Sequence, residues 1–440
     1  MPSKRLAVFV ASFSVILGSL TITTPLFAAT SETVLYSFCS TSGCADGGIP
    51  AGGLVFDSKG NLYGTTNAGG TGQGCADQGT GCGTVFELIP NNGKWTEKVL
   101  YNFCPVNGMC PDGYSPSGSL ILDRDGNLYG TTTSGGTVSG GGTVFELTHK
   151  NGKWTEKVLY SFGYSPDGSD PEAGLVFDKY GNLYGTTFFG GTKDSGTVFE
   201  LMCGNGKWTE KILYNFAGYK NSGNPRFPVI LDKAGNLYGT IVEGGAYGDG
   251  LVFELVLDKG RWTQKWLHSF NHDGKDGIGP GPVIVDNVGN LYGTTANGGA
   301  DTSGCNGYGC GTVFELMHNN SKWTEKVLHS FDGKDGHGSV TNVIFDNVGN
   351  LYGTTYEGGT DSSGCNGFGC GTVFELTPNN GKWTEKLLHS FGSTPDGAQP
   401  SGNLIRDAAG NVYGTTEAGG ANSSFCFSNG GCGTVFEVTP

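Results

Sequence analysis

Short runs of β-branched and aromatic residues recur along the chain, separated by turns rich in Gly, Asn, Asp and Pro. None of the runs has the spacing of an amphipathic helix, so they predict strands. In one stretch they predict four strands, A to D, at residues 175–178, 182–187, 197–201 and 208–216. An Asp-x-x-Gly-Asn turn joins A to B, where Asp caps the turn and Gly supplies the positive φ of a tight hairpin.

The whole unit recurs seven times. Its strand B tetrad, Asn-Leu-Tyr-Gly or once Asn-Val-Tyr-Gly, begins at Asn61, Asn127, Asn182, Asn236, Asn290, Asn350 and Asn411. Four-stranded antiparallel units of about 55 residues are typical of propeller blades, whereas solenoid repeats are shorter or helical. The sequence therefore predicts an all-β fold, a seven-bladed β-propeller that forms a single domain over residues 30–440.

The two ends of the repeat region complement each other. Residues 32–38 have the pattern of strand D, and residues 434–439 have that of strand C. The last unit thus contains A, B and C but no D. We expect the N-terminal strand to join the last blade and to close the ring, which also removes exposed sheet edges.

The recurring phrase Gly-Leu-Val-Phe-Asp-x-x-Gly-Asn-Leu-Tyr-Gly-Thr-Thr, followed by Gly-Gly and Gly-Thr-Val-Phe-Glu-Leu, resembles the GloVer tandem-repeat family of secreted bacterial proteins. The resemblance covers residues 31–440 and implies neither a reaction nor a ligand. Many members are choice-of-anchor proteins, in which an anchoring segment follows the repeats. Here Pro440 comes directly after strand C, so we do not expect such an anchor. Strands A and B are also similar to NHL-type propeller repeats.

The first residues predict export. Lys4 and Arg5 precede an apolar run at residues 6–20, and Pro25 follows before two alanines, which is the pattern of a signal peptide over residues 1–29. The run is shorter than the about 20 residues that a membrane-spanning helix needs. We expect a secreted or periplasmic protein whose mature chain has no membrane span.

The net charge limits the classes of partner that the protein is expected to bind. Of 26 Lys and Arg, the signal peptide removes two, which leaves 24 against 40 Asp and Glu, a net charge of −16. An acidic protein of this kind repels phosphate backbones, so we do not expect a nucleic-acid partner. Neutral glycans, cations or another protein fit better.

Thirteen cysteines form six close couples and one remainder, Cys203. In an exported chain the couples predict six local disulfides. Zinc is disfavoured because there is no Cys-x-x-Cys pair and no histidine near the couples. The predicted pairs are Cys39 with Cys44, Cys75 with Cys82, Cys104 with Cys110, Cys305 with Cys310, Cys365 with Cys370, and Cys426 with Cys432.

Residues that repeat in every blade are expected to be structural. They include the strand B tyrosines, the strand C Phe-Glu pairs and the strand D tryptophans. His268, His329 and His389 occupy a strand D position that is Tyr in the other blades.

An Asp-Gly phrase recurs in the D-to-A loops. It either makes turns or forms a ring of carboxylates that collects a cation. It begins at Asp46, Asp112, Asp167, Asp276, Asp335 and Asp396, with Asn221 in the seventh loop.

The B-to-C and D-to-A loops share one face, which carries all the cysteine couples and varies most between blades. Binding loops on a rigid scaffold are usually the variable ones, so this face is the predicted functional one. Its candidate ligand-binding residues are Phe188, Phe189, Glu243, Tyr356 and Glu357. Aromatic rings stack on sugars and carboxylates accept hydroxyl hydrogen bonds. The alternative is that the rings pack between blades.

These observations favour a non-catalytic binding or scaffold protein, a monomer whose partner is an extracellular polysaccharide or a protein. The alternative is a polysaccharide-active hydrolase or lyase that uses carboxylates of the disulfide-bearing face. The sequence contains no Gly-x-Ser-x-Gly, His-Glu-x-x-His or phosphate-binding glycine loop. It therefore names no catalytic residue, no cofactor and no metal, and leaves the question of an enzyme open.

Overall fold

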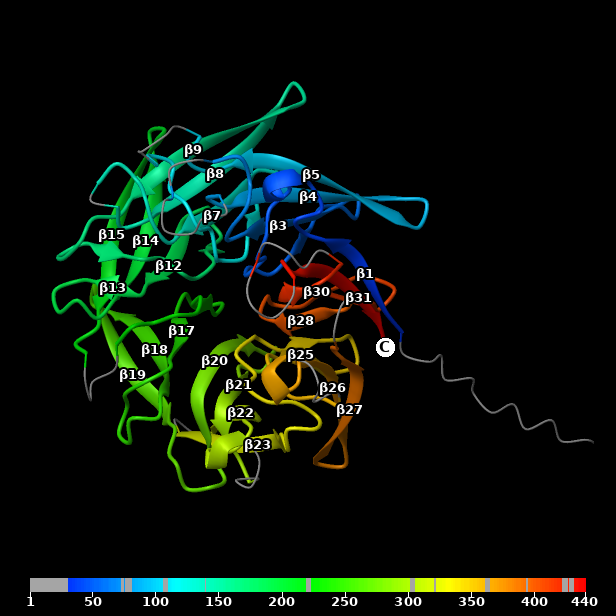
Figure 1. The fold of residues 1–440 in the computed structure, drawn as a ribbon. Coiled ribbons are helices and arrows are strands. Elements are labelled where there is room, and N and C mark those ends of the chain that lie inside the picture. Colours follow the sequence, from blue (N-terminus) through cyan, green and yellow to red (C-terminus); the bar gives the residue numbers. More distant parts are fainter. Residues whose placement is uncertain are drawn as a thin grey trace, which may run out of the picture.

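A computed structural model describes residues 31–72, 75, 81–105, 110–138, 140–218, 223–300, 305–319, 322–360, 365–392, 395–421, 426 and 431–440. In it, seven antiparallel sheets surround a central axis (Figure 1). The predicted seven-bladed propeller is confirmed. The predicted signal peptide lies outside the described residues.

Strands A and B form the inner half of each blade. Strand A is β2 (Val55–Phe56), β6 (Ile121–Leu122), β11 (Val176–Phe177), β16 (Ile230–Leu231), the end of β20 (Gly277–Val285), β24 (Ile344–Phe345) and β29 (Ile405–Arg406). Strand B is β3 (Leu62–Thr66), β7 (Leu128–Thr132), β12 (Leu183–Thr187), β17 (Leu237–Ile241), β21 (Leu291–Gly298), β25 (Leu351–Thr355) and β30 (Val412–Gly419). Strand A is shorter than the four residues predicted, because only two of them pair with strand B in most blades.

Strands C and D form the outer half. Strand C is β4 (Thr84–Asn91), β8 (Thr143–Lys150), β14 (Thr197–Gly204), β18 (Leu251–Asp258), β22 (Thr312–Asn319), β26 (Thr372–Asn379) and β31 (Thr434–Thr439). Strand D is β5 (Lys94–Asn102), β9 (Lys153–Ser161), β15 (Lys207–Asn215), β19 (Arg261–Ser269), β23 (Lys322–Ser330), β27 (Lys382–Ser390) and β1 (Ser31–Ser37). The loops add β10 (Gly168–Ser169), β13 (Phe189–Gly190), β28 (Gly397–Pro400) and the short helices η1 (Ser42–Cys44), η2 (Cys305–Gly307) and η3 (Cys365–Gly367).

Blade 7 is built from both ends of the chain. Strand β1 pairs antiparallel with β31, from Ser31 opposite Thr439 to Ser37 opposite Thr434. The blue N-terminal strand and the red C-terminal strand lie side by side in Figure 1. This seam between β1 and β31 confirms the predicted closure of the ring.

The hydrophobic core is divided into seven clusters, each between two neighbouring blades. In the cluster between blades 2 and 3, Phe162 at the end of one blade's strand D packs edge-to-face on Phe199 of the next blade, with ring centroids 5.0 Å apart. The edge of Phe199 faces Gly185, where a Cβ would lie 2.5 Å from its Cζ. The repeated Phe and the strand B Gly are therefore one packing unit.

The other residues repeated in every blade also hold the blades together. Tyr184 donates a hydrogen bond from Oη to Glu200 Oε1, 2.8 Å away, and lies near Asp178 of the A-to-B turn. Trp154 of strand D packs against Tyr63 of the preceding blade. These contacts agree with the structural role expected for the repeated Tyr, Glu and Trp.

Each junction between strands D of neighbouring blades contains a recurring group of polar side chains. Tyr101 donates from Oη to Asp112 Oδ2 at 2.8 Å, and Glu156 of the next blade lies beside them. Oδ1 of Asp112 and Oε1 of Glu156 are buried and have no hydrogen-bond partner among the described residues. Burial and the neighbouring Asp112 charge raise the pKa of Glu156 from 4.5 to about 8. At one junction Gln264 replaces the glutamate, and the sequence has Asn221 in place of the aspartate.

We expect stability to fall as the pH rises from about 4.5 to 8. The folded state holds a proton on Glu156 that the unfolded chain releases at a lower pH, so the stabilisation present below pH 4.5 is lost as the pH rises through the folded pKa. The substitution Glu156→Gln should flatten this dependence and raise the unfolding midpoint at pH 8. Midpoints at pH 5 and pH 8 check this, with Glu243→Gln on an exposed loop as the control. A parent whose midpoint is higher at pH 8 would contradict the expectation.

Candidate functional site

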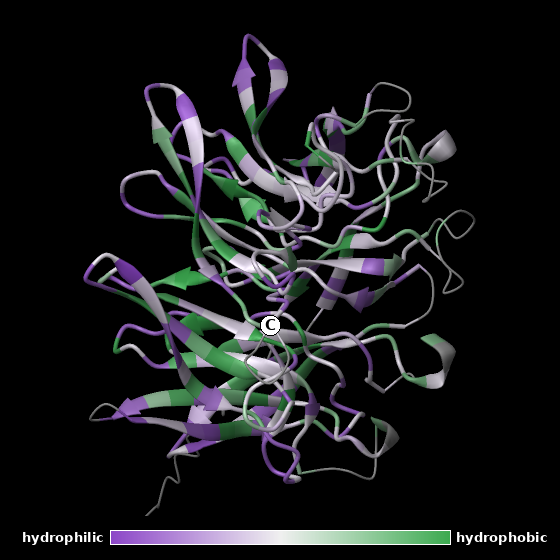
Figure 2. Cartoon of the chain, turned by 90° about the vertical axis from the view of Figure 1, so that its left-hand side faces the viewer, coloured by the Kyte–Doolittle hydropathy of each residue, from purple (hydrophilic) through white to green (hydrophobic). Residues whose placement is uncertain are grey.

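The B-to-C and D-to-A loops lie on one face of the propeller, and all the disulfides lie among them. Figure 2 shows these loops on one side of the disc and the hydrophilic tips of the C-to-D hairpins on the other. The six predicted couples are all disulfide-bonded, and Cys203 is a free, exposed cysteine, as expected. The disulfides thus order loops of a single face.

The Asp-Gly phrases do not form a ring around the channel. Asp167 accepts hydrogen bonds from Tyr160 Oη (3.1 Å) and from the amide of Gly163 (2.8 Å) at a blade junction. A Cβ on Gly168 would lie 2.6 Å from Thr187, because this loop pairs with β13, which follows strand B closely. Among the described residues that line the axial cavity, none is an aspartate of these phrases. The turn-forming interpretation therefore explains them better than a carboxylate ring around the channel.

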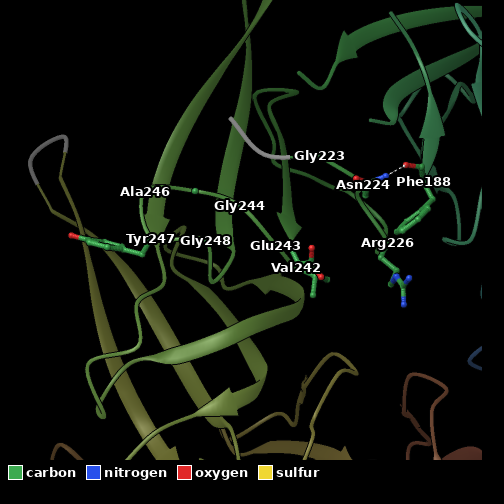
Figure 3. A pocket seen from close by; sticks show the side chains of 11 residues that line it. Phe188, Gly223, Asn224, Arg226, Val242, Glu243, Gly244, Ala246, Tyr247 and Gly248 are labelled. Atoms are coloured by element: carbon green, nitrogen blue, oxygen red, sulfur yellow. Dashed lines mark hydrogen bonds between the residues drawn. The ribbon is translucent and has the colours of Figure 1, made fainter. Parts of the chain in front are cut away.

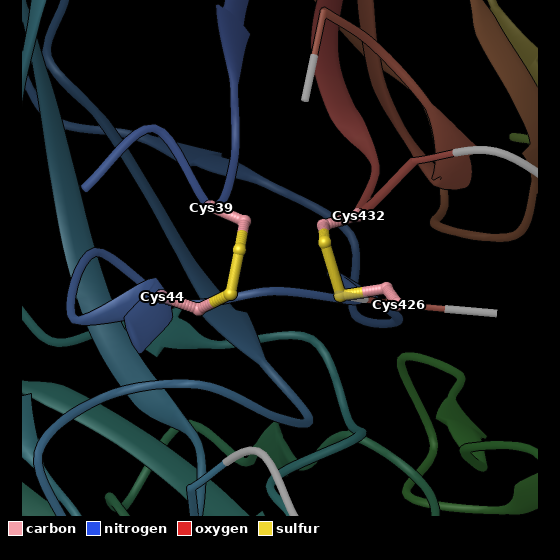
Figure 4. A group of neighbouring side chains, drawn as sticks. All are labelled: Cys39, Cys44, Cys426 and Cys432. Carbon is pink, nitrogen blue, oxygen red and sulfur yellow. A yellow bond between two sulfur atoms is a disulfide. The ribbon is translucent and has the colours of Figure 1, made fainter. Parts of the chain in front are cut away.

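Two disulfides stack across the seam. Cys39–Cys44 belongs to the loop that enters blade 1, and Cys426–Cys432 belongs to blade 7 (Figure 4). One sulfur from each of the four cysteines lies within 4.8 Å of the others. Sequence reasoning treated the couples as separate, because they lie at opposite ends of the chain and only ring closure brings them together.

A cavity of about 680 Å³ lies at the axis on the loop face. In six blades its wall includes the residue that follows the proline of the D-to-A loop. In one of these loops Ser339 takes the place of the proline. The residue that follows differs in kind between blades. The six are Ala51, Ser117, Glu172, Arg226, Val340 and Ser401.

Charged groups gather on one part of this wall. Arg226 Nε lies 3.3 Å from Glu172 Oε2, and Asp170 is nearby. Burial raises the pKa of Asp170 and of Glu172, while the positive charge of Arg226 partly offsets the shift. Burial also raises the pKa of Glu417, which accepts a hydrogen bond from Tyr356 Oη at 3.2 Å. The cavity therefore holds carboxyl groups able to carry a proton or to accept a hydrogen bond.

A second cavity, of about 580 Å³, lies between blades 3 and 4 and also includes Arg226 (Figure 3). We call it the blade 3–4 groove. The Arg226 guanidinium lies 4.7 Å from the centre of the Phe188 ring, and Asn224 donates to the Phe188 carbonyl at 2.8 Å. The lining residues of the groove run from Phe188 to Tyr247, with Glu243 between them (Figure 3). The Tyr247 ring points away from Phe188, and the residue is 67% exposed.

The structure brings together only some of the predicted ligand-binding residues. Phe188 and Glu243 line the blade 3–4 groove, and Phe189 packs edge-to-face on Phe188 at 4.6 Å while remaining 42% exposed. The Tyr356 hydroxyl donates a hydrogen bond to Glu417, and Glu357 Oε2 lies 3.1 Å from His337 Nδ1. The five residues therefore do not form one site.

Sequence reasoning missed Asp170, Glu172, Arg226 and Tyr247. The signal was present for two of them, since the residue after the loop proline varies in kind from Ala to Glu and Arg within an otherwise regular phrase. For Tyr247 the signal was a different one, because the B-to-C loop of blade 3 has the same length and has Lys193 at the equivalent position. Among the described residues, Glu32, His389 and Asp396, where blade 6 meets blade 7, form the one group outside the disulfide cysteines whose arrangement could hold a metal ion.

Three overlapping stretches, residues 18–226, 205–365 and 306–440, match the model of the Gloeobacter/Verrucomicrobia repeat. The chain belongs to this repeat family. The Gloeobacter/Verrucomicrobia repeat thus spans all seven blades, which confirms the resemblance seen in the sequence. No curated protein matches the chain.

Two solved structures are among those to which this repeat protein is similar. One is a fungal alcohol oxidase of the AA5 family in complex with copper. It is 14% identical in sequence with a TM-score of 0.55, and the match covers 94% of this chain and 77% of the oxidase. Pseudomonas fluorescens PhoX in complex with vanadate is 11% identical with a TM-score of 0.44, covering 93% of this chain and 95% of PhoX. At such identities the likeness to the oxidase shows the propeller fold and nothing of the reaction.

The disulfides are typical of an extracytoplasmic compartment. Within the part of the chain that the structure describes, no helix has the length and apolar character to cross a lipid bilayer.

Proposed function

We propose that this protein is an extracytoplasmic binding protein for a neutral polysaccharide, which it holds in the blade 3–4 groove. The observation that carries the proposal is the groove itself, in which Phe188, Glu243 and Tyr247 line one cavity of about 580 Å³. Binding sites usually combine apolar surface with a few polar groups that fix orientation. The Arg226 guanidinium supports the Phe188 ring from one side.

The chemistry of the groove suits a sugar chain. The Phe188 and Tyr247 rings offer apolar faces at the two ends, and the Glu243 carboxylate and Asn224 amide offer hydrogen-bond partners between them. The groove shares Arg226 with the axial cavity, so a long chain can continue toward the axis. The net charge of −14 disfavours polyanionic glycans and leaves neutral ones.

The double substitution of Phe188 and Tyr247 by Ala is expected to weaken binding about 30-fold, since each stacked ring contributes about 1 kcal/mol. Affinity electrophoresis in gels containing soluble β-glucan, xylan or galactomannan measures this as lost retardation. The control is Tyr180→Ala, which removes a 78% exposed tyrosine from an A-to-B turn on the opposite face. A parent protein that none of these glycans retards, or a double variant that is retarded like the parent, would refute the proposal.

A second candidate function, polysaccharide hydrolysis, has one observation in its favour. Asp170, Glu172 and Glu417 are carboxyl groups with raised pKa values around one cavity, and glycoside hydrolysis uses a pair of carboxyls as acid and as base or nucleophile. The same glycans, incubated with the protein, distinguish the two functions. Release of reducing ends that disappears in Glu417→Gln would favour the hydrolase, and its absence alongside retention favours the binding protein.

A further inference from the structure

The junction between blades 6 and 7 lies beside the β1–β31 seam, because its strand D glutamate, Glu32, is on β1, and we call it the seam junction, or the seam for short in this subsection. It differs from most other junctions in the strand D residue that contacts the loop aspartate. At the junctions after blades 1, 2 and 7 a strand D tyrosine donates to the loop aspartate, whereas at the seam the partner of Asp396 is His389. His389 lies on β27 of blade 6, Asp396 lies in the loop that enters blade 7, and Glu32 lies on β1, the strand that closes the ring. Three segments thus meet here, each with one residue that can ligate a metal.

The geometry of this group is compact. His389 Nε2 lies 3.1 Å from Asp396 Oδ2, and one ligand atom from each of Glu32, His389 and Asp396 lies within 4.8 Å of the other two. The amides of Gly392 and Gly397 donate to the two Asp396 oxygens at 2.9 and 2.7 Å, which fixes that carboxylate.

The glutamate of this group has an unsatisfied oxygen. Oε1 of Glu32 is buried from solvent and accepts no hydrogen bond from any described residue, which is also true of the strand D glutamates at the other junctions. The group at Glu32 is distinguished from these by the approach of its three ligand atoms. A buried carboxylate oxygen without a partner costs free energy, and it lies beside a second carboxylate, which adds repulsion. A cation bound between the two would remove both penalties.

We infer that Glu32, His389 and Asp396 form a site for a divalent transition-metal cation such as Zn²⁺ at the seam of the propeller. Zinc takes imidazole nitrogen and carboxylate oxygen at about 2.0–2.2 Å, and ligands on one such ion lie about 3 to 3.5 Å apart, close to the 3.1 Å seen between His389 and Asp396. The nitrogen ligand disfavours Ca²⁺ and Mg²⁺, which prefer oxygen. Water completes the coordination.

Residues of the same types occur at two other junctions. His268 and His329 also bond a loop aspartate, at 3.0 and 2.8 Å, and a strand D glutamate lies nearby. Among the described residues, however, only the seam brings one ligand atom from each of the three within 4.8 Å. The seam is therefore the site, and the junction at His329 provides a matched control.

The consequence concerns ring closure. A cation held by Glu32, His389 and Asp396 links β1 to blade 6 and to the loop that enters blade 7, so binding requires the closed ring. A ligand that binds the folded state alone raises the unfolding midpoint. Zinc should therefore stabilise the protein through the seam.

The experiment uses the full protein with Cys203→Ser, which removes the free thiol, after treatment with EDTA and dialysis. Equilibrium dialysis against Zn²⁺ counts bound metal, and thermal unfolding measures its effect. We expect one Zn²⁺ per chain bound at the seam and a midpoint raised by several degrees, with no rise at the same concentration of Ca²⁺. The variant His389→Tyr should lose both effects and still fold, because tyrosine occupies this position at other junctions.

Two further variants separate a seam site from general zinc binding. Glu32→Gln should also lose the bound equivalent, and His329→Tyr, the same substitution at the control junction, should retain it. Absence of Zn²⁺ uptake by the parent, or uptake that His389→Tyr and Glu32→Gln both retain, would overturn the inference. Equal loss in His329→Tyr and His389→Tyr would overturn it too, because the metal would then not be specific to the seam.

Discussion

Removal of residues 31–38 is expected to open the propeller at blade 7 and to cause the largest loss of stability among the changes proposed for this protein. Strand β31 would lose its whole pairing with β1, leaving a row of unpaired backbone groups at an exposed edge. Phe38, which is fully buried and packs 5.0 Å from Phe86 of blade 1, would leave a cavity that alone costs about 3–5 kcal/mol. Thermal unfolding should show a midpoint lowered by many degrees, and size-exclusion chromatography should show oligomers.

Addition in trans of a peptide that spans residues 31–40 provides the control. It should restore monomers and part of the midpoint if the loss comes from the missing strand, whereas the same peptide with Phe38→Ala should restore less. A truncated protein that melts like the parent and stays monomeric would show that the seam does not hold the ring.

The substitution Gly185→Ala is expected to destabilise the protein by about 1–3 kcal/mol, although alanine suits a strand as well as glycine does. The new Cβ would lie 2.5 Å from Cζ of the buried Phe199, and a ring packed on Phe162 has little room to move. Denaturant unfolding measures the change. Gly181→Ala is the matched control, because its Cβ would meet nothing within 4 Å and its cost, about 1–2 kcal/mol, comes only from a φ of +87°.

Pairing Gly185→Ala with Phe199→Leu tests the cause. Phe199→Leu should destabilise the parent through a cavity, and should destabilise the Gly185→Ala variant much less, since leucine makes room for the added methyl group. Additive free energies of unfolding would show that the clash with Phe199 is not the source of the loss.

The sequence predicted the architecture well because the determinants of a blade are local and recur in register. The Asp-x-x-Gly-Asn turn and the alternation of strand residues define each hairpin without knowledge of its neighbours. The six disulfides were predictable for the same reason, since each closes a short loop. The short strand A was overestimated, because its outer residues have strand-like sequence but no partner for pairing.

The candidate site was less predictable, because it is made between blades. Phe188 was identifiable as a residue that departs from the repeat, but its contact with Arg226 of the next blade depends on how two loops meet. Tyr356 looked equally free in the sequence, yet its hydroxyl is bonded to Glu417 of blade 7. A repeat pattern gives the place of a residue within its blade and not the side chain that faces it from the adjacent one.

The pairing at the seam also determines how the ring responds to tension. Ser31, at the start of β1, and Thr439, at the end of β31, are opposite each other at the same end of the β1–β31 ladder. A force that pulls these ends apart therefore acts on one pair of backbone hydrogen bonds at a time and unzips the ladder, instead of shearing all the bonds together. The disulfides in the structure are all local and none crosses the seam, so no covalent link resists the peeling of β1. Blade 7 is thus the blade that we expect to open first when Ser31 and Thr439 are pulled apart.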